Sequence, residues 1–265
     1  HSKLAVSVFL PVTKLLETST GDPYQPEYVF YKSRFARPQI YLNTIFRLGE
    51  KSPYAISIGA LTGFAASAET FASTRLSGDA SPSWGKAKVL AKPSFGLLAS
   101  ISYQTTKGYL SFAFQQELQS NFDAAIVGQA PLGGSSSIAF NLNASSMIGY
   151  DPMILRLSYS HSMDNLKFLG TVEYQYWGGY SNPTLKLASG SIINPSKDFE
   201  PLNTKNIIVP KIGVEWRVNP KFILRSGYMY RPTPLVKDHT LPGNSLDANV
   251  HALSLGVGYL FNMFS

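Results

Sequence analysis

The sequence holds few side chains that could carry out chemistry. It has four histidines and no cysteines. His161 lies in "SYSHSMD" beside a short turn, and His239 and His251 lie near a long polar stretch. A Ser/His/acid hydrolase is recognised by geometry rather than by sequence order, and no motif around these histidines supports one. Without cysteine there is no disulfide scaffold and no Cys-rich metal site. We therefore expect no enzymatic activity, no metal and no cofactor.

Charged side chains recur at alternate positions in three consecutive stretches. Successive side chains of a strand point to opposite faces, so residues of one alternation share a face. Mixed signs on neighbouring strands predict ion pairs that brace the inner wall of a barrel, and direct contact with a ligand is the alternative. Counted from a turn at 219–221, Glu215 should lie opposite Arg225 on that face. The candidate cluster comprises Lys167, Glu173, Lys211, Glu215, Arg217, Arg225 and Arg231.

Alternation with a period of two residues recurs along the whole chain and predicts strands. In Leu253–Tyr259, every second residue is large and apolar, and the residues between them are small. We predict ten strands: Leu4–Val12, Gln39–Leu48, Tyr54–Ala66, Ser94–Gln104, Tyr109–Leu118, Ile138–Ser162, Leu166–Trp177, Ile207–Val218, Phe222–Arg231 and Asn249–Phe261.

The connections between these strands alternate between short and long. Tight turns are predicted at 49–53, 105–108, 163–165 and 219–221, and long loops at 13–38, 67–93, 119–137, 178–206 and 232–248. This asymmetry is typical of a meandering transmembrane barrel, with short periplasmic turns and long external loops. It also favours one long strand over Ile138–Ser162, with an irregularity at Asp151–Pro152 that projects above the membrane, because a turn there would break the alternation.

Composition agrees with a membrane barrel. Only 15% of the 265 residues are charged, and the mean hydropathy is -0.02. No run approaches the roughly 20 apolar residues of a transmembrane helix. We therefore expect an all-β fold, an antiparallel transmembrane β-barrel, with a soluble β protein as the alternative. The net charge of +7 comes from scattered basic residues, so nucleic acid is not an expected partner. Aromatic girdles are expected from Tyr41, Tyr54, Tyr103, Tyr109, Tyr174, Tyr176, Tyr228, Tyr230, Tyr259 and Phe261.

Three segments of the sequence resemble the FadL-type outer-membrane transporters of long-chain fatty acids and aromatic hydrocarbons. The most specific is "NIIVPKIGVEWRVNPKFILRSGYMYRPTPLVKDHTLPGNSLDANVHALSLGVGYLF" (206–261), with two strands around a tight turn, a Pro-containing motif, a loop and an "LS-x-G" strand. The second is "DPMILRLSYSHSMDNLKFLGTVEYQYW" (151–177), which closes on Tyr and Trp. A weaker likeness covers "KLAVSVFLPV" (3–12) and residues 42–67.

The resemblance implies a barrel of fourteen strands with an N-terminal plug, whereas ten strands are predicted here and no plug segment is seen. We expect residues 1–265 to form a single outer-membrane β-barrel domain that is part of a fourteen-stranded barrel. On this interpretation the plug and two strands precede His1, two strands follow Ser265, and both visible ends lie on the periplasmic side. The alternative is a ten-stranded barrel without a plug, for which the resemblance gives less support to transport.

The resemblance also implies a function. It is passive uptake of hydrophobic small molecules, such as long-chain fatty acids, across the outer membrane of a Gram-negative bacterium. Expected partners are membrane lipid and lipopolysaccharide, together with a hydrophobic ligand or detergent. The alternative is a non-transporting barrel that anchors or docks a surface or secretion assembly, with a protein partner at long loops such as "YQPEYVFYKSRF" (24–35). A stoichiometric partner in a native pull-down would favour this alternative.

Pro11 is a candidate position for lateral opening. Members of the family have a kinked wall strand that opens the barrel towards lipid, and by strand order Leu4–Val12 would be that strand. Proline has no amide hydrogen, so it removes one hydrogen bond between strands. The alternative is that Pro11 only ends the strand at the external rim.

Overall fold

The computed structural model describes residues 2–9, 39–50, 52–63, 66–74, 83–133, 136–180, 186–187, 203–236 and 247–260. Among these residues, no helix is long and apolar enough to cross a membrane. The strands are β1 (Ser2–Phe9), β2 (Gln39–Arg47), β3 (Tyr54–Gly63), β4 (Ala66–Thr74), β5 (Ser83–Ala91), β6 (Ser94–Thr105), β7 (Gly108–Gln115), β8 (Leu118–Gly133), β9 (Ser136–Asp151), β10 (Met153–Met163), β11 (Leu166–Tyr176), β12 (Lys186–Leu187), β13 (Ile207–Arg217), β14 (Phe222–Arg231) and β15 (Val250–Tyr259).

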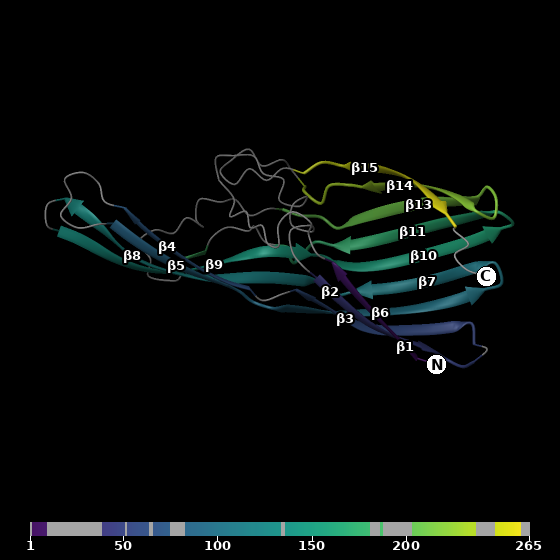
Figure 1. The fold of residues 1–265 in the computed structure, drawn as a ribbon, viewed down its shortest axis with the longest axis horizontal. Helices are drawn as coiled ribbons and strands as arrows, with labels where there is room; N and C mark the ends of the chain where they lie inside the picture. Colours follow the sequence, from purple (N-terminus) through teal and green to yellow (C-terminus); the bar gives the residue numbers. More distant parts are fainter. Residues whose placement is uncertain are drawn as a thin grey trace.

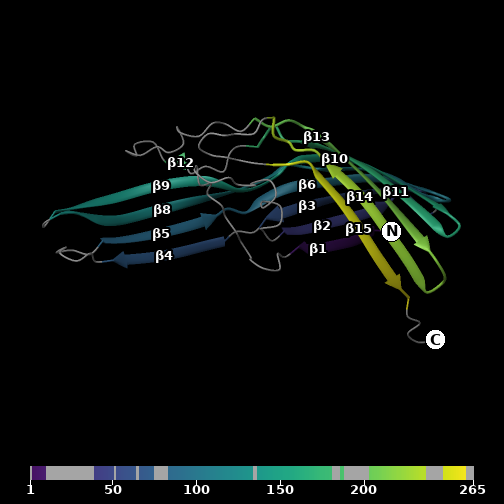
Figure 2. The ribbon, with the colours of Figure 1, turned by 90° about the horizontal axis from the view of Figure 1, so that it is seen from above.

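Ten of these strands form one antiparallel sheet, which we call the wall. Their order is β1-β2-β3-β6-β7-β10-β11-β13-β14-β15. Each wall strand overlaps one of the ten predicted strands, so the predicted all-β, antiparallel fold is confirmed. Figure 2 shows the β15 edge running at a steep angle to the β1 edge, which gives the sheet the strong twist of a barrel wall. The β1 and β15 edges do not pair with each other in the described part of the chain, so the wall is open.

Four short connections lie at one end of the wall, where the predicted tight turns join β2 to β3, β6 to β7, β10 to β11 and β13 to β14 (Figure 1). The start of β1 and the end of β15 lie at this same end, because Ser2 pairs with Phe46 and Tyr259 pairs with Phe222 beside those turns. The first and last wall strands therefore begin and end on the side of the tight turns, as predicted.

The other five strands form a second sheet, the external sheet, in the order β12-β9-β8-β5-β4. It extends from the end of the wall opposite the tight turns (Figure 1). Here the prediction of long loops at 67–93 and 119–137 was wrong, since these residues contain β4, β5 and β8. Two pairs of neighbouring wall strands, β3/β6 and β7/β10, continue outwards as the hairpins β4/β5 and β8/β9. The strand β8 in this sheet has 16 residues. At a rise of about 3.3 Å per strand residue, such a strand is about 50 Å long.

Pro152 marks the boundary between the two sheets. The predicted long strand over Ile138–Ser162, with an irregularity at Asp151–Pro152, is present as β9 and β10, which only Pro152 separates. β9 pairs with β8 up to Asp151, and β10 pairs with β7 and β11 from Met153 and Ile154 onwards. Proline lacks the amide hydrogen that a continuous hydrogen-bond ladder needs, so the strand is interrupted at this residue.

Large apolar side chains cover one face of the wall, which we call the outer face. Leu253, Leu255 and Val257 are 74%, 79% and 71% exposed, and their neighbours on β14 and β13 are also exposed. The predicted alternation therefore has the correct phase. Most aromatic residues predicted for girdles lie on this face, but Tyr41 and Tyr109 point inwards: Tyr41 lines an inner pocket, and Tyr109 lies below the Lys167 ammonium. Phe261 lies outside the described residues.

Candidate functional site

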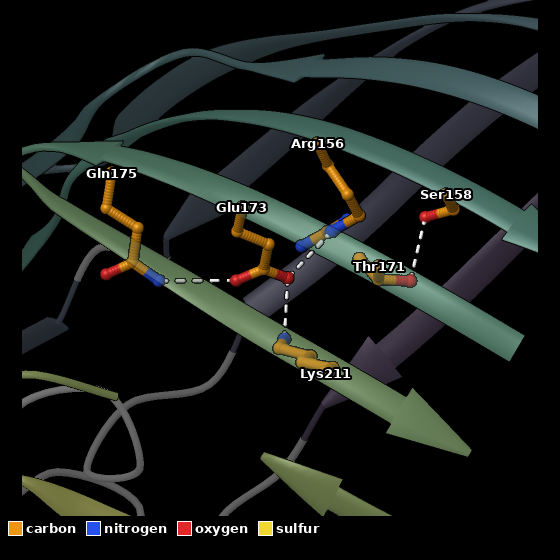
Figure 3. Close-up of polar contacts among 6 residues, drawn as sticks. All are labelled: Arg156, Ser158, Thr171, Glu173, Gln175 and Lys211. Carbon is orange, nitrogen blue, oxygen red and sulfur yellow. Dashed lines mark hydrogen bonds and ion pairs between the residues drawn. The ribbon is translucent and has the colours of Figure 1, made fainter. Parts of the chain in front are cut away.

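Three neighbouring strands place an ion-pair triad on the inner face of the wall (Figure 3). The Glu173 carboxylate on β11 accepts from Arg156 Nε on β10 at 2.8 Å and from Lys211 Nζ on β13 at 2.6 Å. Arg156 lies directly opposite Glu173 in the register. Of the candidate cluster, the structure thus brings together Glu173 and Lys211, and it adds Arg156, which the sequence prediction missed.

The buried member of the triad is the carboxylate. The Glu173 side chain is 3% exposed, whereas the Arg156 and Lys211 side chains are 39% and 37% exposed. A buried charge is tolerated only when it is paired and hydrogen-bonded. Both conditions hold here, because the second carboxylate oxygen accepts from Gln175 Nε2 at 3.2 Å.

A polar chain continues from the triad towards the external end of the wall. Gln175 Oε1 accepts from Trp177 Nε1 at 3.3 Å, and both side chains are buried. Trp177 belongs to an apolar cluster that connects β9, β11 and β13 with the segment after β14. Its buried members are Met147, Tyr150, Trp177, Ile207, Val209 and Leu235, with Tyr180 and Met229 packed against them.

Tyr150 anchors this cluster at the base of the external sheet. Its ring contacts Trp177 at a centroid distance of 5.8 Å, and its hydroxyl donates to Glu117 Oε2 at 2.7 Å. Burial, reinforced by the hydrogen bond to the Glu117 carboxylate, raises the pKa of the Tyr150 phenol well above its ordinary value, because both effects disfavour the phenolate. Tyr150 is therefore a permanent hydrogen-bond donor at neutral pH.

A second ion pair lies nearer the tight turns. Arg225 Nε on β14 donates to Glu215 Oε2 on β13 at 2.7 Å, and the two residues are register partners. This confirms the predicted contact. Lys167 is the register partner of Glu215 on the other side, and its ammonium lies 5.9 Å from the centre of the Tyr109 ring. Arg217, opposite Ile223, makes no side-chain ion pair with the described residues.

The remaining residue of the predicted cluster, Arg231, binds a partner from outside the strands. Its Nη2 donates to Asp247 Oδ1 at 2.9 Å, where β14 ends and the chain approaches β15. The Asp247 carboxylate is 3% exposed, and its Oδ2 has no hydrogen-bond partner in the part of the chain that is described. Asp247 lies in a predicted loop, so the sequence gave no indication that it would pair with Arg231.

The external sheet has two chemically different faces. One carries Glu69, Lys86, Lys88 and Asp123, and Glu69 pairs with Lys86 at 2.8 Å. The hydrogen bond and charge of Lys86 lower the pKa of the Glu69 carboxyl. The opposite face carries no charged residue among the described residues of β4, β5, β8 and β9 down to Gly149. Its members include Thr70, Ala72, Ala87, Val89, Ala91, Phe122, Ala124, Ile126, Phe140, Leu142 and Ala144.

This uncharged face continues the inner face of the wall. Along β8, Phe122 and Ala124 alternate in phase with Leu118 and Ser120. The Ser120 hydroxyl shares a hydrogen bond with the Ser94 hydroxyl at 2.9 Å. Ser94 lies next to Phe95 in the same strand, and Phe95 is 70% exposed on the outer face, so Ser94 points to the opposite, inner face. Ser94 and Ser120 therefore point inwards, and one surface runs from the external sheet into the wall.

A pocket of about 340 Å³ lies on the inner face of the wall, between β1 and β10. Arg156 is the one charged residue among those that line it, and the other lining residues are small, aliphatic, aromatic or uncharged polar. They are Ala5, Tyr41, Asn43, Ile45, Ser57, Leu98, Ala99, Ser100, Ala113, Phe114, Gln115 and Ile154.

Neither described wall histidine belongs to a hydrolase-like set. His161 and His251 lie in the outer-face phase, where their ring nitrogens contact Tyr159 at 3.3 Å and Tyr228 at 2.7 Å. His239 and the candidate opening residue Pro11 lie outside the described residues. Within the described residues, no three His, Asp or Glu side chains group as they would around a metal ion.

A wall with large apolar side chains outside, paired charges inside and short turns at one end defines an outer-membrane β-barrel wall. Comparison with solved structures identifies its type. The chain is similar to a Pseudomonas aeruginosa FadL homologue, with a TM-score of 0.59 and 17% identity over 85% of this chain and 56% of that chain. It is similar to a TodX deltaS2S3 mutant, a monoaromatic hydrocarbon channel, with a TM-score of 0.54 and 13% identity over 98% and 69% of the two chains.

A third similar structure is the Ralstonia pickettii toluene transporter TbuX, with a TM-score of 0.51 and 15% identity over 97% of this chain and 68% of that chain. In sequence, 126 residues are 22% identical to alkane uptake protein A of Marinobacter nauticus; they make up 46% of this chain and 27% of that protein. This chain therefore spans 56% of the first structure and about a quarter of the alkane uptake protein. No family model matches the sequence.

The fold is that of the FadL-type outer-membrane transporters of Gram-negative bacteria, as the sequence resemblance predicted.

Proposed function

We propose that this chain forms part of an outer-membrane passage for the passive uptake of hydrophobic small molecules, such as hydrocarbons and long-chain fatty acids. The observation that carries the proposal is the uncharged inner face of the external sheet, which continues into the inner face of the wall. As far as Gly149, the described residues of this surface include no charged side chain whose desolvation would oppose the passage of an apolar molecule; the charged side chains of the inner face begin at Asp151 and continue with Arg156 and Lys211.

Two further observations support the proposal. The inner pocket has a mostly uncharged lining, and its size and lining suit an apolar ligand. The similar proteins include a toluene transporter and an alkane uptake protein. The alternative role is that of a docking platform. It was based on residues 24–35, which lie outside the described residues, and no feature of the described residues favours it.

Uptake of labelled hexadecane and hexadecanoate by cells that lack their own FadL-type transporter tests the proposal. Cells that produce the protein should accumulate at least one of the two labels several-fold faster than empty-vector cells. Equal accumulation in the two strains, with the protein present in the outer membrane, would refute the proposal.

A matched pair of variants tests the uncharged surface itself. Ala87→Glu places a carboxylate on the inner face of β5, and Ala125→Glu places one on the opposite face of the adjacent β8. Ala87→Glu should slow uptake, whereas Ala125→Glu should not. Equal uptake by the two variants, at equal amounts in the membrane, would show that the inner face is not the route.

A further inference from the structure

We propose that Glu173 sets the preference of the passage between neutral and anionic substrates, because it holds Arg156 and Lys211 in a shared ion pair on the inner wall. This inference rests on the proposed function. It assigns a specificity-determining role to a residue whose obvious role is structural.

The geometry places Glu173 behind the two cations, as seen from the passage. Its carboxylate is 3% exposed, and Gln175 holds it from the side away from Arg156 and Lys211 (Figure 3). A substrate therefore meets the guanidinium and the ammonium, each more than a third exposed, and not the carboxylate that compensates them.

Arg156 connects this arrangement to the pocket. It is the one charged side chain in the pocket lining, and its Nε is committed to Glu173. A guanidinium carries five N–H donors in a planar fork that suits carboxylates. The bond to Glu173 occupies one of them and compensates part of the charge, so the affinity of the pocket for a carboxylate is held down while an apolar chain is unaffected.

The direction of the effect follows from counting charges in the triad. With Glu173 ionised, the triad carries two positive charges and one negative charge. Glu173→Gln keeps the shape of the side chain and its acceptor oxygen but removes the negative charge. Attraction between the wall and an anionic head group therefore rises, and a neutral hydrocarbon gains nothing.

The test measures two substrates in the same cells. Cells producing the protein are given tritiated hexadecane and carbon-14 hexadecanoate together, and the ratio of hexadecanoate to hexadecane uptake is recorded. Once the uptake of empty-vector cells has been subtracted, this ratio does not depend on how much protein each variant yields. Glu173→Gln should raise it several-fold, and Glu173→Asp, which keeps the charge, should leave it close to the wild-type value.

Controls come from the same strands and the same face. Thr171→Val removes the hydrogen bond to Ser158 at 3.0 Å without changing charge, and it should leave the ratio unchanged. Arg156→Gln and Lys211→Gln each remove a positive charge and should lower the ratio. These two variants decide the question if Glu173→Gln does not reach the outer membrane.

The inference is overturned if the ratio in Glu173→Gln equals that of the wild type, or, where that variant is absent, if the ratio is unchanged in both Arg156→Gln and Lys211→Gln. The proposed function fails differently. In that case wild-type cells accumulate neither label faster than empty-vector cells.

Discussion

Glu215 and Arg225 face each other across β13 and β14 on the inner side of the wall, and 2.7 Å separates Glu215 Oε2 from Arg225 Nε. Their side chains are 30% and 52% exposed, in contrast to Glu173, which is 3% exposed beneath its two cations. The inner wall therefore holds two kinds of ion pair: one open to solvent, and one built around a buried carboxylate.

The open pair should contribute little to stability. Solvent screens partly exposed charges, and a cross-strand pair of opposite charges contributes roughly 0.2–1 kcal/mol. Glu215→Gln should therefore lower the free energy of unfolding by no more than this amount. Urea unfolding of the protein in lipid vesicles measures the change, and a larger loss would show that solvent does not reach the pair.

The buried carboxylate should matter more. Glu173→Leu removes the counter-ion of the partly exposed Arg156 and Lys211 and leaves the buried Gln175 amide without its acceptor. An unsatisfied buried polar group costs about 1–3 kcal/mol. We expect Glu173→Leu to lose at least twice as much unfolding free energy as Glu215→Leu in the same assay. Equal losses would contradict the difference in burial between the two sites.

The sequence predicts strand faces and register well, but partners beyond a single hairpin poorly. The register counted from the turn at 219–221 correctly placed Glu215 opposite Arg225. The same count from the predicted turn at 163–165 would place Arg156 opposite Val172, one residue away from Glu173, because the actual turn is shorter and Met163 pairs with Leu166. Lys211 reaches Glu173 diagonally from the next strand, and Asp247 reaches Arg231 from outside the strands, so neither contact follows from a turn.

The external sheet was missed for a chemical reason. Wall strands face lipid on one side, so alternate residues are large and apolar, as in Leu253–Tyr259. The external strands face water, and their inner positions are often alanine, so "ASAETFAST" of β4 has little contrast between its faces. Weak contrast and many small residues are also typical of loops, and nothing in such a pattern separates the two.

The lipid-facing side of the wall should not tolerate charge. Leu255 lies in the middle of β15 and is 79% exposed on the outer face. An arginine near the bilayer midplane costs roughly 2–4 kcal/mol. Leu255→Arg should therefore reduce the fraction that folds into lipid vesicles, as judged by heat-modifiable migration in gels. Ser254→Arg, which points inwards, is the control and should fold normally; similar folding of both variants would place the apolar face away from lipid.

Stability should depend on alkaline pH through Tyr150. The pKa of its phenol is raised in the folded protein, whereas in the unfolded chain the pKa is about 10. The protonated Tyr150 phenol therefore contributes its full stabilisation of the folded state below pH ~10. This contribution is lost as the pH rises above that value, because the phenol then releases its proton freely only in the unfolded chain. Tyr150→Phe removes this term. The difference in unfolding free energy between wild type and Tyr150→Phe should shrink from pH 8 to pH 11, and a constant difference would show that the phenol ionises freely in the folded state.

The orientation of the two sheets gives the last prediction. Short turns lie at one end of the wall and the external sheet at the other (Figure 1), and in outer-membrane barrels short turns face the periplasm while long connections face outwards. Lys88, on the charged face of β5, should therefore lie outside the cell, and Lys107, in the turn between β6 and β7, should lie in the periplasm; both are exposed. The chain has no cysteine, so Lys88→Cys and Lys107→Cys each introduce a unique thiol.

A membrane-impermeant maleimide should label the first variant in intact cells and the second only after the outer membrane has been permeabilised. Equal detection of both thiols after permeabilisation would establish that the two variants are equally reactive. Labelling of Lys107→Cys in intact cells, with Lys88→Cys protected, would invert the orientation and would place the uncharged surface of the five-stranded sheet on the periplasmic side.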